Sequence, residues 1–383
     1  MGPLEGHTVI EIAGLGPGPF AAMLLADMGA DVIRVERPGG SLFAAAHDPR
    51  LDFLNRNKRC IGIDLKKPEG AATVLTMLER ADALLEGNRP GVMERLGLGP
   101  DDCLERNPAL IYGRMTGWGQ EGPMAGAAGH DINYIALAGA LHPIGRRGEK
   151  PAIPLNLVGD FGGGGLLLAY GMVCALLEAK GSGRGQVVDA AMIDGAAALM
   201  ASTFGAHQAG FWSDERGTNL LDSGAHFYEV YETADGKYIA LGAIESQFYD
   251  NLLQKLGEDS VHFENQFDID NWPAMKDRMA EIVRRKTRDE WDEIFAGTDA
   301  CYAPVLSMDE VRHHPHHRAR GTFIDDGDVW QPAPAPRFSR TPAAPPRAAA
   351  GIGEHTAEVL KEFGFSDEQI RARLEDGVLH RAR

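Results

Sequence analysis

Two side chains able to exchange protons with a substrate each stand just before an apolar segment. His130 and Asp131 precede the segment that begins at Ile132, and Asp160 precedes glycines and an apolar run that extends to Leu177. Imidazole and carboxyl groups serve as general acids and bases when their surroundings adjust their pKa values. If both groups lie at helix starts in one domain, they can converge on one crevice. The pair then suits removal and return of a proton next to a carbonyl group.

An isolated histidine before a helix is more often a cap or a surface residue, so the pairing with Asp160 is what favours chemistry. Aspartate is a favoured N-cap residue, and we expect Asp160 to open a long buried helix. Glycines at 162–165 would each destabilise that helix by up to about 1 kcal/mol relative to alanine. This cost indicates that something approaches the backbone there. Amides at the helix start could then stabilise a negatively charged oxygen.

Short β-rich segments alternate with amphipathic helical segments through the first half of the chain. This alternation is typical of a doubly wound α/β domain, a parallel sheet with helices on both faces. Such folds bind ligands at the carboxyl ends of their strands. The expected strands are residues 8–12, 31–36, 60–64, 83–86, 110–114 and 186–189, and the expected helices are residues 20–28, 68–80, 92–96 and 193–209.

The second half changes in character. Residues 227–232 and 237–241 alternate with period two around Ala234-Asp-Gly236, which predicts a hairpin. Three helical patterns follow, and the proline-rich residues 331–346 are typical of an extended connector. We therefore expect an α/β protein with a Rossmann-like large domain and a small α+β domain joined by long linkers. The large domain is residues 1–210 with 335–383, the small domain is residues 225–325, and the linkers are residues 210–225 and 325–335.

A glycine-rich turn, Gly14-Leu-Gly-Pro-Gly-Pro19, follows the first expected strand and is similar to a dinucleotide fingerprint. Glu36 even ends the second strand, where such folds place an acid. Pro19, however, replaces the third glycine of the fingerprint. A tight turn with a proline that starts the helix is the better interpretation, so no NAD site is expected.

Nine basic residues lie around the loops after the early strands. Taken singly, each is best explained as part of a solvated face balanced by nearby acids. As a group they lie where a doubly wound fold binds phosphate, and arginine suits bidentate phosphate contacts. The nine are Arg34, Arg37, Arg56, Lys58, Arg59, Lys66, Lys67, Arg89 and Arg95.

The formal net charge of -17 over 383 residues argues against a nucleic-acid or anionic membrane partner. The 4 cysteines form no CxxC pair, and the histidines within 313–317 lack a carboxylate or cysteine at ligand spacing, so no metal site is expected. This cysteine usage fits a cytoplasmic location. The apolar run 161–177 is shorter than the ~20 residues that span a bilayer, which predicts a core helix without membrane insertion.

Six motifs, in order along the chain, resemble the alpha-methylacyl-CoA racemases, which have the family III CoA-transferase fold. The similarity runs from about residue 4 to about residue 342. One motif would be weak, whereas six in this order are specific. The motifs are Gly14-Leu-Gly-Pro-Gly-Pro19, Met115-Thr-Gly-Trp-Gly-Gln120, Gly129-His-Asp-Ile-Asn-Tyr134, Asn156-Leu-Val-Gly-Asp160, Gln186-Val-Val-Asp-Ala-Ala-Met192 and Gly242-Ala-Ile-Glu245.

The resemblance implies racemisation of 2-methylacyl-CoA thioesters through an enolate, with no cofactor other than the CoA that the substrate carries. It also implies an interlocked homodimer with its active site at the subunit interface. By motif, His130 and Asp160 would be the acid/base pair, and Glu245 would orient His130. Three arginines match positions that hold the CoA phosphates, and three polar residues match supporting positions near the thioester. They are Arg37, Arg56 and Arg95, and Asp131, Asn156 and Asp194.

Two alternatives stay open. A family III CoA-transferase would use Asp160 as a nucleophile that forms a mixed anhydride with an acyl group. A non-catalytic acyl-CoA-binding module would also explain the basic cluster. The pairing of His130 with Glu245 favours racemisation, because a transferase has no evident need for a second acid/base group.

Overall fold

The chain forms two compact units. The computed structural model describes residues 2–40, 48–257, 263 and 265–382. The first unit comprises Met1–Ala138, Leu155–Leu199 and Gly321–Arg383, and the second comprises Gly139–Pro154 and Met200–Arg320. The division expected from the sequence differs at three places: residues 139–154 and 200–210 belong to the second unit, and residues 321–325 belong to the first.

The first unit contains a seven-stranded sheet in the order β12-β3-β2-β1-β4-β5-β6. Strands β1 to β6 pair in parallel, as expected, but the edge strand β12 runs antiparallel to β3. From β1 the chain adds strands first on one side and then on the other, so a topological switch point lies between β1 and β4. The strands are β1 Thr8–Ile12, β2 Asp31–Glu36, β3 Arg59–Ile63, β4 Ala83–Glu86, β5 Ile111–Thr116, β6 Gln186–Ala191 and β12 Leu379–His380.

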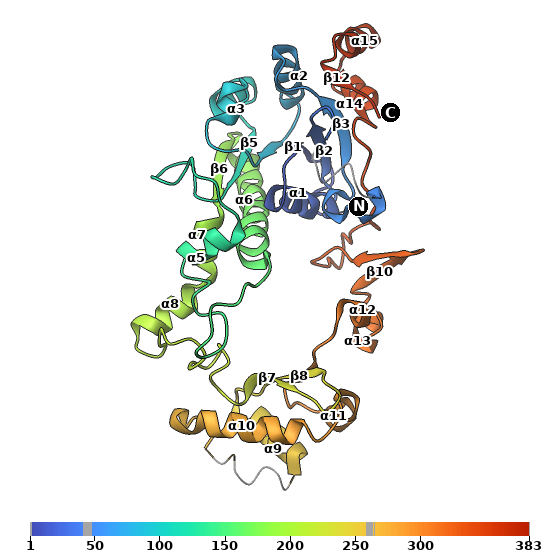
Figure 1. The fold of residues 1–383 in the computed structure, drawn as a ribbon. Helices are drawn as coiled ribbons and strands as arrows, with labels where there is room; N and C mark the ends of the chain where they lie inside the picture. Colours follow the sequence, from blue (N-terminus) through green and yellow to red (C-terminus); the bar gives the residue numbers. More distant parts are fainter. Residues whose placement is uncertain (1, 41–47, 258–262, 264, 383) are drawn as a thin grey trace. The chain divides into compact units, whose positions relative to one another are not determined.

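Helices cover both faces of this sheet (Figure 1). Successive residues of a strand point to opposite faces, so apolar residues in sequence can pack against helices on both sides. Ile10 and Ile33 belong to one core, and Val9 and Val32 belong to the other. The first core includes residues of α2 (Pro68–Leu78), α3 (Val92–Arg95), α4 (Pro100–Arg106), α14 (Thr356–Glu362) and α15 (Asp367–Glu375). The second core includes residues of α1 (Pro17–Asp27) and α6 (Leu167–Ser182).

The helix after Asp160 differs from the expected core helix. A π-helical segment, η3 (Leu157–Leu166), leads directly into α6. Together they form 26 residues that are apolar and long enough to cross a membrane by length and composition, and 39% of the most apolar window is buried. One face packs in the second core, whereas Leu166, Tyr170 and Leu177 are exposed. The helix is therefore only half buried within one chain.

The second unit is built around the predicted hairpin, which the structure confirms. β7 (Tyr228–Glu232) pairs antiparallel with β8 (Tyr238–Gly242), and β9 (Tyr302–Pro304) adds to β8. Its core includes residues of α9 (Ser246–Leu256), α10 (Trp272–Val283) and α11 (Arg288–Phe295). The helix expected at 193–209 is two helices, α7 (Met192–Leu199) and α8 (Ala201–Gln208), which belong to different units.

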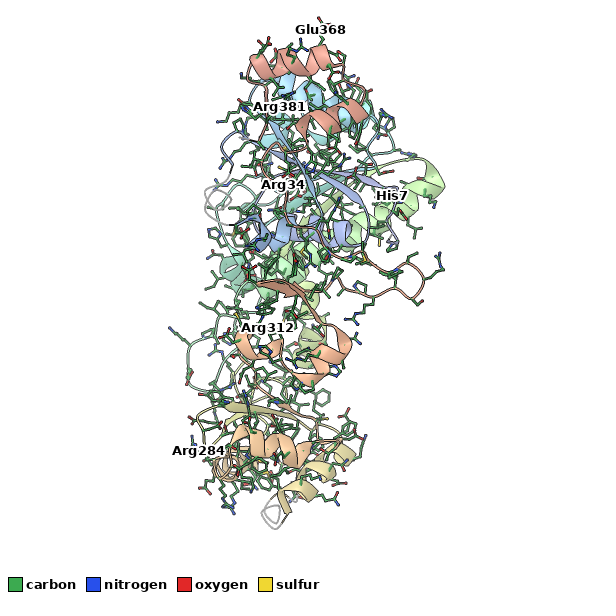
Figure 2. All side chains as sticks on the ribbon, turned by 90° about the vertical axis from the view of Figure 1, so that its right-hand side faces the viewer. His7, Arg34, Arg284, Arg312, Glu368 and Arg381 are labelled. Carbon is green, nitrogen blue, oxygen red and sulfur yellow. The ribbon has the colours of Figure 1, made fainter. Side chains whose placement is uncertain are left out.

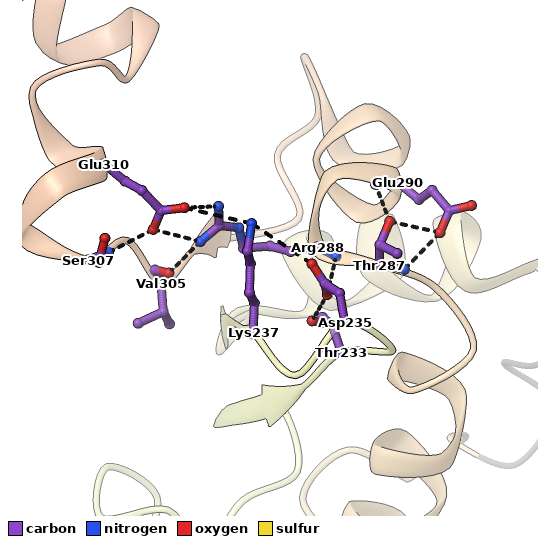
Figure 3. A network of polar contacts seen from close by, with 9 residues as sticks. All are labelled: Thr233, Asp235, Lys237, Thr287, Arg288, Glu290, Val305, Ser307 and Glu310. Atoms are coloured by element: carbon purple, nitrogen blue, oxygen red, sulfur yellow. Dashed lines mark hydrogen bonds and ion pairs between the residues drawn. The ribbon is translucent and has the colours of Figure 1, made fainter.

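A polar network fixes the start of α11 in the second unit (Figure 3). Arg288 binds Glu310 through both terminal nitrogens, at 3.1 and 2.5 Å, and its Nη1 donates to the Val305 carbonyl oxygen at 2.9 Å. The Thr287 hydroxyl caps α11 by accepting from the Glu290 amide.

The remaining helices and strands of the described residues are short. They are η1 Pro49–Leu51, η2 Phe53–Asn55, α5 Asp131–Leu137, η5 Ile269–Asn271, α12 Met308–Val311, α13 Pro315–Arg320, β10 Phe323–Asp326 and β11 Val329–Pro332.

Candidate active site

A pocket of about 490 Å³ lies at the switch point of the first unit. Gly16 reaches it from the loop after β1, Asn88 from the loop after β4, and Thr116 from the end of β5. His130 and Asp160 both line this pocket. The expected convergence of these two side chains on a strand-end crevice is therefore confirmed.

His130 is the N-cap residue of α5, and its imidazole is exposed to the pocket. Its backbone N–H donates to Asn133 Oδ1 at 3.1 Å. The turn before it is held by Tyr134, whose hydroxyl donates to the Gly129 carbonyl oxygen. A side chain at Gly129 would meet the Tyr134 ring at 2.7 Å, so glycine is required there. Trp118 packs edge-on against the same ring at 4.7 Å, which fixes the approach of the chain to His130.

The sequence predicted Asp160 as the N-cap residue of a helix. In the structure Asp160 instead lies inside the first turn of η3. The N-cap position belongs to Asn156, whose Nδ2 donates to Asp160 Oδ2 at 3.1 Å. Asp131 Oδ2 accepts hydrogen bonds from the backbone N–H groups of Gly159 and Asp160, both at 2.7 Å. These two amides are therefore engaged by Asp131 and are not free to stabilise an enolate oxygen.

The surroundings of Asp160 favour its neutral form. Burial raises the pKa of Asp160 above that of a free aspartate, and the nearby Asp131 charge raises it further, against the lowering effects of the Asn156 hydrogen bond and of His130. This direction of shift suits a carboxyl group that must act as an acid as well as a base. The helix start alone would have favoured the ionised form.

The glycines after Asp160 serve helix packing. A side chain at Gly163 would come within 2.6 Å of the Ala196 backbone nitrogen on α7, and one at Gly165 within 2.5 Å of the Pro17 carbonyl oxygen on α1. The glycines therefore allow the backbones of α1 and α7 to pack directly against the backbone of η3. The expectation that these glycines give access to a ligand is replaced by this explanation.

Several of the basic residues expected at a phosphate site are buried in ion pairs. Arg56 is 4% exposed, and its guanidinium binds both carboxylate oxygens of Asp27, at 3.1 and 2.5 Å. Lys58 pairs with Glu11 at 2.7 Å, and Arg34, labelled in Figure 2, pairs with Glu36 on its own strand. These three residues are therefore not part of a solvated face, and their charges are balanced by buried acids. Arg56 lies in the interior of the first unit, so its expected contact with a CoA phosphate stays a prediction.

Three other arginines are exposed around the pocket end of the sheet. Arg37 follows β2 and donates from Nε to the Gly40 carbonyl oxygen at 3.0 Å, and Arg95 ends α3. Arg89, in the loop after β4, lines the pocket itself. The sequence included Arg89 only as one of nine basic residues. Its position directly after a strand was the signal that could have selected it.

The remaining predicted residues, Asp194 and Glu245, are not among the residues that line this pocket. Asp194 is exposed in the first turn of α7. Glu245 is the N-cap residue of α9 in the second unit and is also exposed. The second unit holds a larger cavity of about 790 Å³, with Trp212 and Tyr228 in its wall. None of the predicted site residues lines that cavity.

The switch-point pocket and the doubly wound sheet agree with the comparison to protein families. The model of CoA-transferase family III matches residues 4–356. The chain therefore belongs to CoA-transferase family III.

Within this family, the chain is similar to racemases along its whole length. It is 50% identical to alpha-methylacyl-CoA racemase of Mus musculus over 378 residues, which cover 98% of this chain and 97% of that protein. It is 48% identical to the Homo sapiens racemase over 379 residues, with the same coverage. The crystal structure of a CAIB/BAIF family protein from Brucella suis superposes with a TM-score of 0.81 at 26% identity, covering 94% of this chain and 99% of that one.

Proposed function

We propose that this protein is an isomerase that racemises 2-methylacyl-CoA thioesters, as the names of its racemase relatives indicate for those proteins. The observation that carries the proposal is the shared position of His130 and Asp160 on the wall of one pocket at the switch point. A proton donor and a proton acceptor on one pocket are what inversion of an acidic carbon requires.

In the proposed mechanism, one of the two groups removes the α-proton of the thioester. The electron pair moves into the carbonyl group and gives an enolate, whose oxygen requires hydrogen-bond donors. The other group then returns a proton to the opposite face of the same carbon. Both groups exchange roles for the reverse direction, so Asp160 must be able to hold a proton. Its raised pKa supports this role.

The CoA part of the substrate is proposed to bind through exposed arginines. Arg37, Arg89 and Arg95 are available for the phosphate groups, because each is exposed in the first unit. Guanidinium groups hold phosphate oxygens in bidentate geometry. The -17 net charge of the chain makes such a local cluster necessary for an anionic ligand.

We also propose that the protein acts as a homodimer in which Glu245 orients His130. Support for association comes from η3 and α6, which expose a row of apolar side chains at helical spacing. A second copy would remove this row from water. Its members are Leu166, Tyr170, Val173 and Leu177.

A CoA-transferase that uses Asp160 as a nucleophile is the alternative. The two activities differ at the α-carbon, which only racemisation deprotonates. Incubation of an (R)-2-methylacyl-CoA in deuterated water should therefore introduce deuterium at that carbon together with inversion. His130→Gln and Asp160→Asn should each abolish inversion. Transfer of CoA to an added acid without α-deuteration would contradict the racemase assignment.

A further inference from the structure

The carboxylate of Asp131 joins the two elements that carry the acid/base candidates. Asp131 is the first residue of α5, directly after His130, and its Oδ2 accepts from the Gly159 and Asp160 amides of η3 at 2.7 Å each. The side chain is buried, with the residue 5% exposed. One buried oxygen therefore connects the His130 end of α5 to the backbone of Asp160 itself.

The local structure is built for this contact. The first amides of a helix lack partners within the helix, and a carboxylate placed there satisfies them. A side chain at Gly159 would come within 2.6 Å of Asp131 Oδ2, so only glycine allows the carboxylate to approach. The second oxygen, Oδ1, is buried and has no hydrogen-bond partner among the described residues.

The charged and titratable groups around Asp160 come from several elements. Asp131, His130 and Tyr134 lie at or near the start of α5. The charge of Asp131 raises the pKa of Asp160 and His130 lowers it, whereas Asp160 in turn raises the pKa of Tyr134. On the other elements packed against η3, α7 carries exposed Asp194, and Asp27 of α1 is paired with Arg56. Arg89 lines the same pocket from the loop after β4. Asp131 is the group among these that adds negative charge to Asp160, and it does so from a fixed position.

We propose that Asp131 is a positioning residue that acts through Asp160, and that its carboxylate does not contact the substrate. It holds the Asp160 backbone in register with His130, and its charge favours the proton-holding form of Asp160. The family resemblance implied only that Asp131 has a supporting position near the thioester, and that support is here assigned to Asp160. The inference rests on the proposed function only in taking His130 and Asp160 as the reacting pair.

Two substitutions separate the two parts of this role. Because both amides bind a single oxygen, the amide oxygen of Asp131→Asn can accept both hydrogen bonds while the charge is lost. We expect this variant to keep most of its kcat and to shift the acid limb of kcat/KM to lower pH, on the order of 1 pH unit. Asp131→Ala loses the hydrogen bonds as well, and we expect kcat to fall about 10²-fold through misplacement of Asp160. Asp101→Asn, at an exposed site on α4, is the matched control and should change neither property.

A direct readout keeps the inference testable if the enzyme catalyses another reaction. The pKa of Asp160 can be followed by carbon NMR of its labelled carboxyl group in the wild type and in Asp131→Asn, with Asp160→Asn used to assign the signal. A lower pKa in Asp131→Asn supports the inference whatever the substrate. An unchanged pKa, together with an Asp131→Ala variant that keeps its kcat, would overturn it. Absence of α-proton exchange with an altered Asp160 pKa would instead contradict only the proposed function.

Discussion

Asn156 donates a hydrogen bond from its Nδ2 to Asp160 Oδ2 at 3.1 Å and thereby stabilises the ionised carboxylate. Asn156→Ala removes this donor, so the pKa of Asp160 should rise further above its ordinary value. If Asp160 must be ionised to act as a base, the acid limb of the pH profile of kcat/KM should move to higher pH. The direction is opposite to that expected for Asp131→Asn. A shift of both variants in the same direction would show that general distortion, and not charge, moves the profile.

Close packing of η3 predicts that its glycines cannot be enlarged. Gly163→Ala would place a methyl group 2.6 Å from the Ala196 nitrogen, and overpacking of this kind costs about 1–3 kcal/mol. Gly181→Ala is the control within α6, because a side chain there meets nothing within 4 Å. The control should be stabilised by up to about 1 kcal/mol through helix propensity. Denaturant unfolding measures both, and equal effects at the two positions would contradict the packing explanation.

The Asp27–Arg56 pair predicts a stability effect in place of a binding effect. Arg56→Ala leaves the carboxylate of Asp27, a residue only 3% exposed, without its cation, which should cost about 3–5 kcal/mol. KM for an acyl-CoA should change little. Arg106→Ala, which breaks the exposed pair with Glu79, should cost less than about 1 kcal/mol. A raised KM for Arg56→Ala with unchanged stability would restore Arg56 to the phosphate site.

His226 predicts that the second unit loses stability in acid. Its Nε2 lies 2.7 Å from the Tyr249 hydroxyl, which itself donates to the Phe263 carbonyl oxygen, so Nε2 carries the proton and Nδ1 is bare. Burial lowers the pKa of His226 from 6.5 to about 4. Between these values the unfolded chain binds a proton that the folded chain does not. The free energy of unfolding should therefore be highest above pH 6.5 and should fall by up to about 3 kcal/mol as the pH drops to 4.

Urea unfolding at pH 7 and pH 4.5 tests this prediction, with His226→Phe as the comparison. Phenylalanine suits the aromatic neighbours Phe227 and Phe263 and cannot be protonated. The variant should be less sensitive to the pH change than the wild type. An identical loss of stability in both proteins would assign the pH dependence to other groups.

Much of the sheet and the crevice that holds His130 and Asp160 could be predicted because their signals are local. Short β-rich segments located β1 to β4 within a residue or so, and Pro17 at the start of α1 matches the turn expected from the glycine-rich motif. What failed depended on distant partners. The use of Gly163 and Gly165 depends on α7 and α1, and a sequence cannot show which backbone will approach.

The burial of Arg56 had the same cause, since Asp27 becomes its partner only when α1 packs beside η2. The helix start at Asp160 was misassigned for another reason. A π-helical turn has no composition of its own, so the strong capping preference of aspartate was a misleading guide. Strand β12 spans only Leu379–His380, which is too short for any periodic pattern.

The position of β12 has a consequence for the order in which the protein is made. Leu379 pairs with Ile63, so the edge strand β12 is translated after the six strands that form the rest of the sheet. The second unit, whose residues end at Arg320, emerges in full before that strand does. Domains tend to fold as units during synthesis. We therefore expect the second unit to fold on the nascent chain before β12 is added to the sheet. During that interval the edge of β3 lacks its antiparallel partner, and a chaperone could bind there.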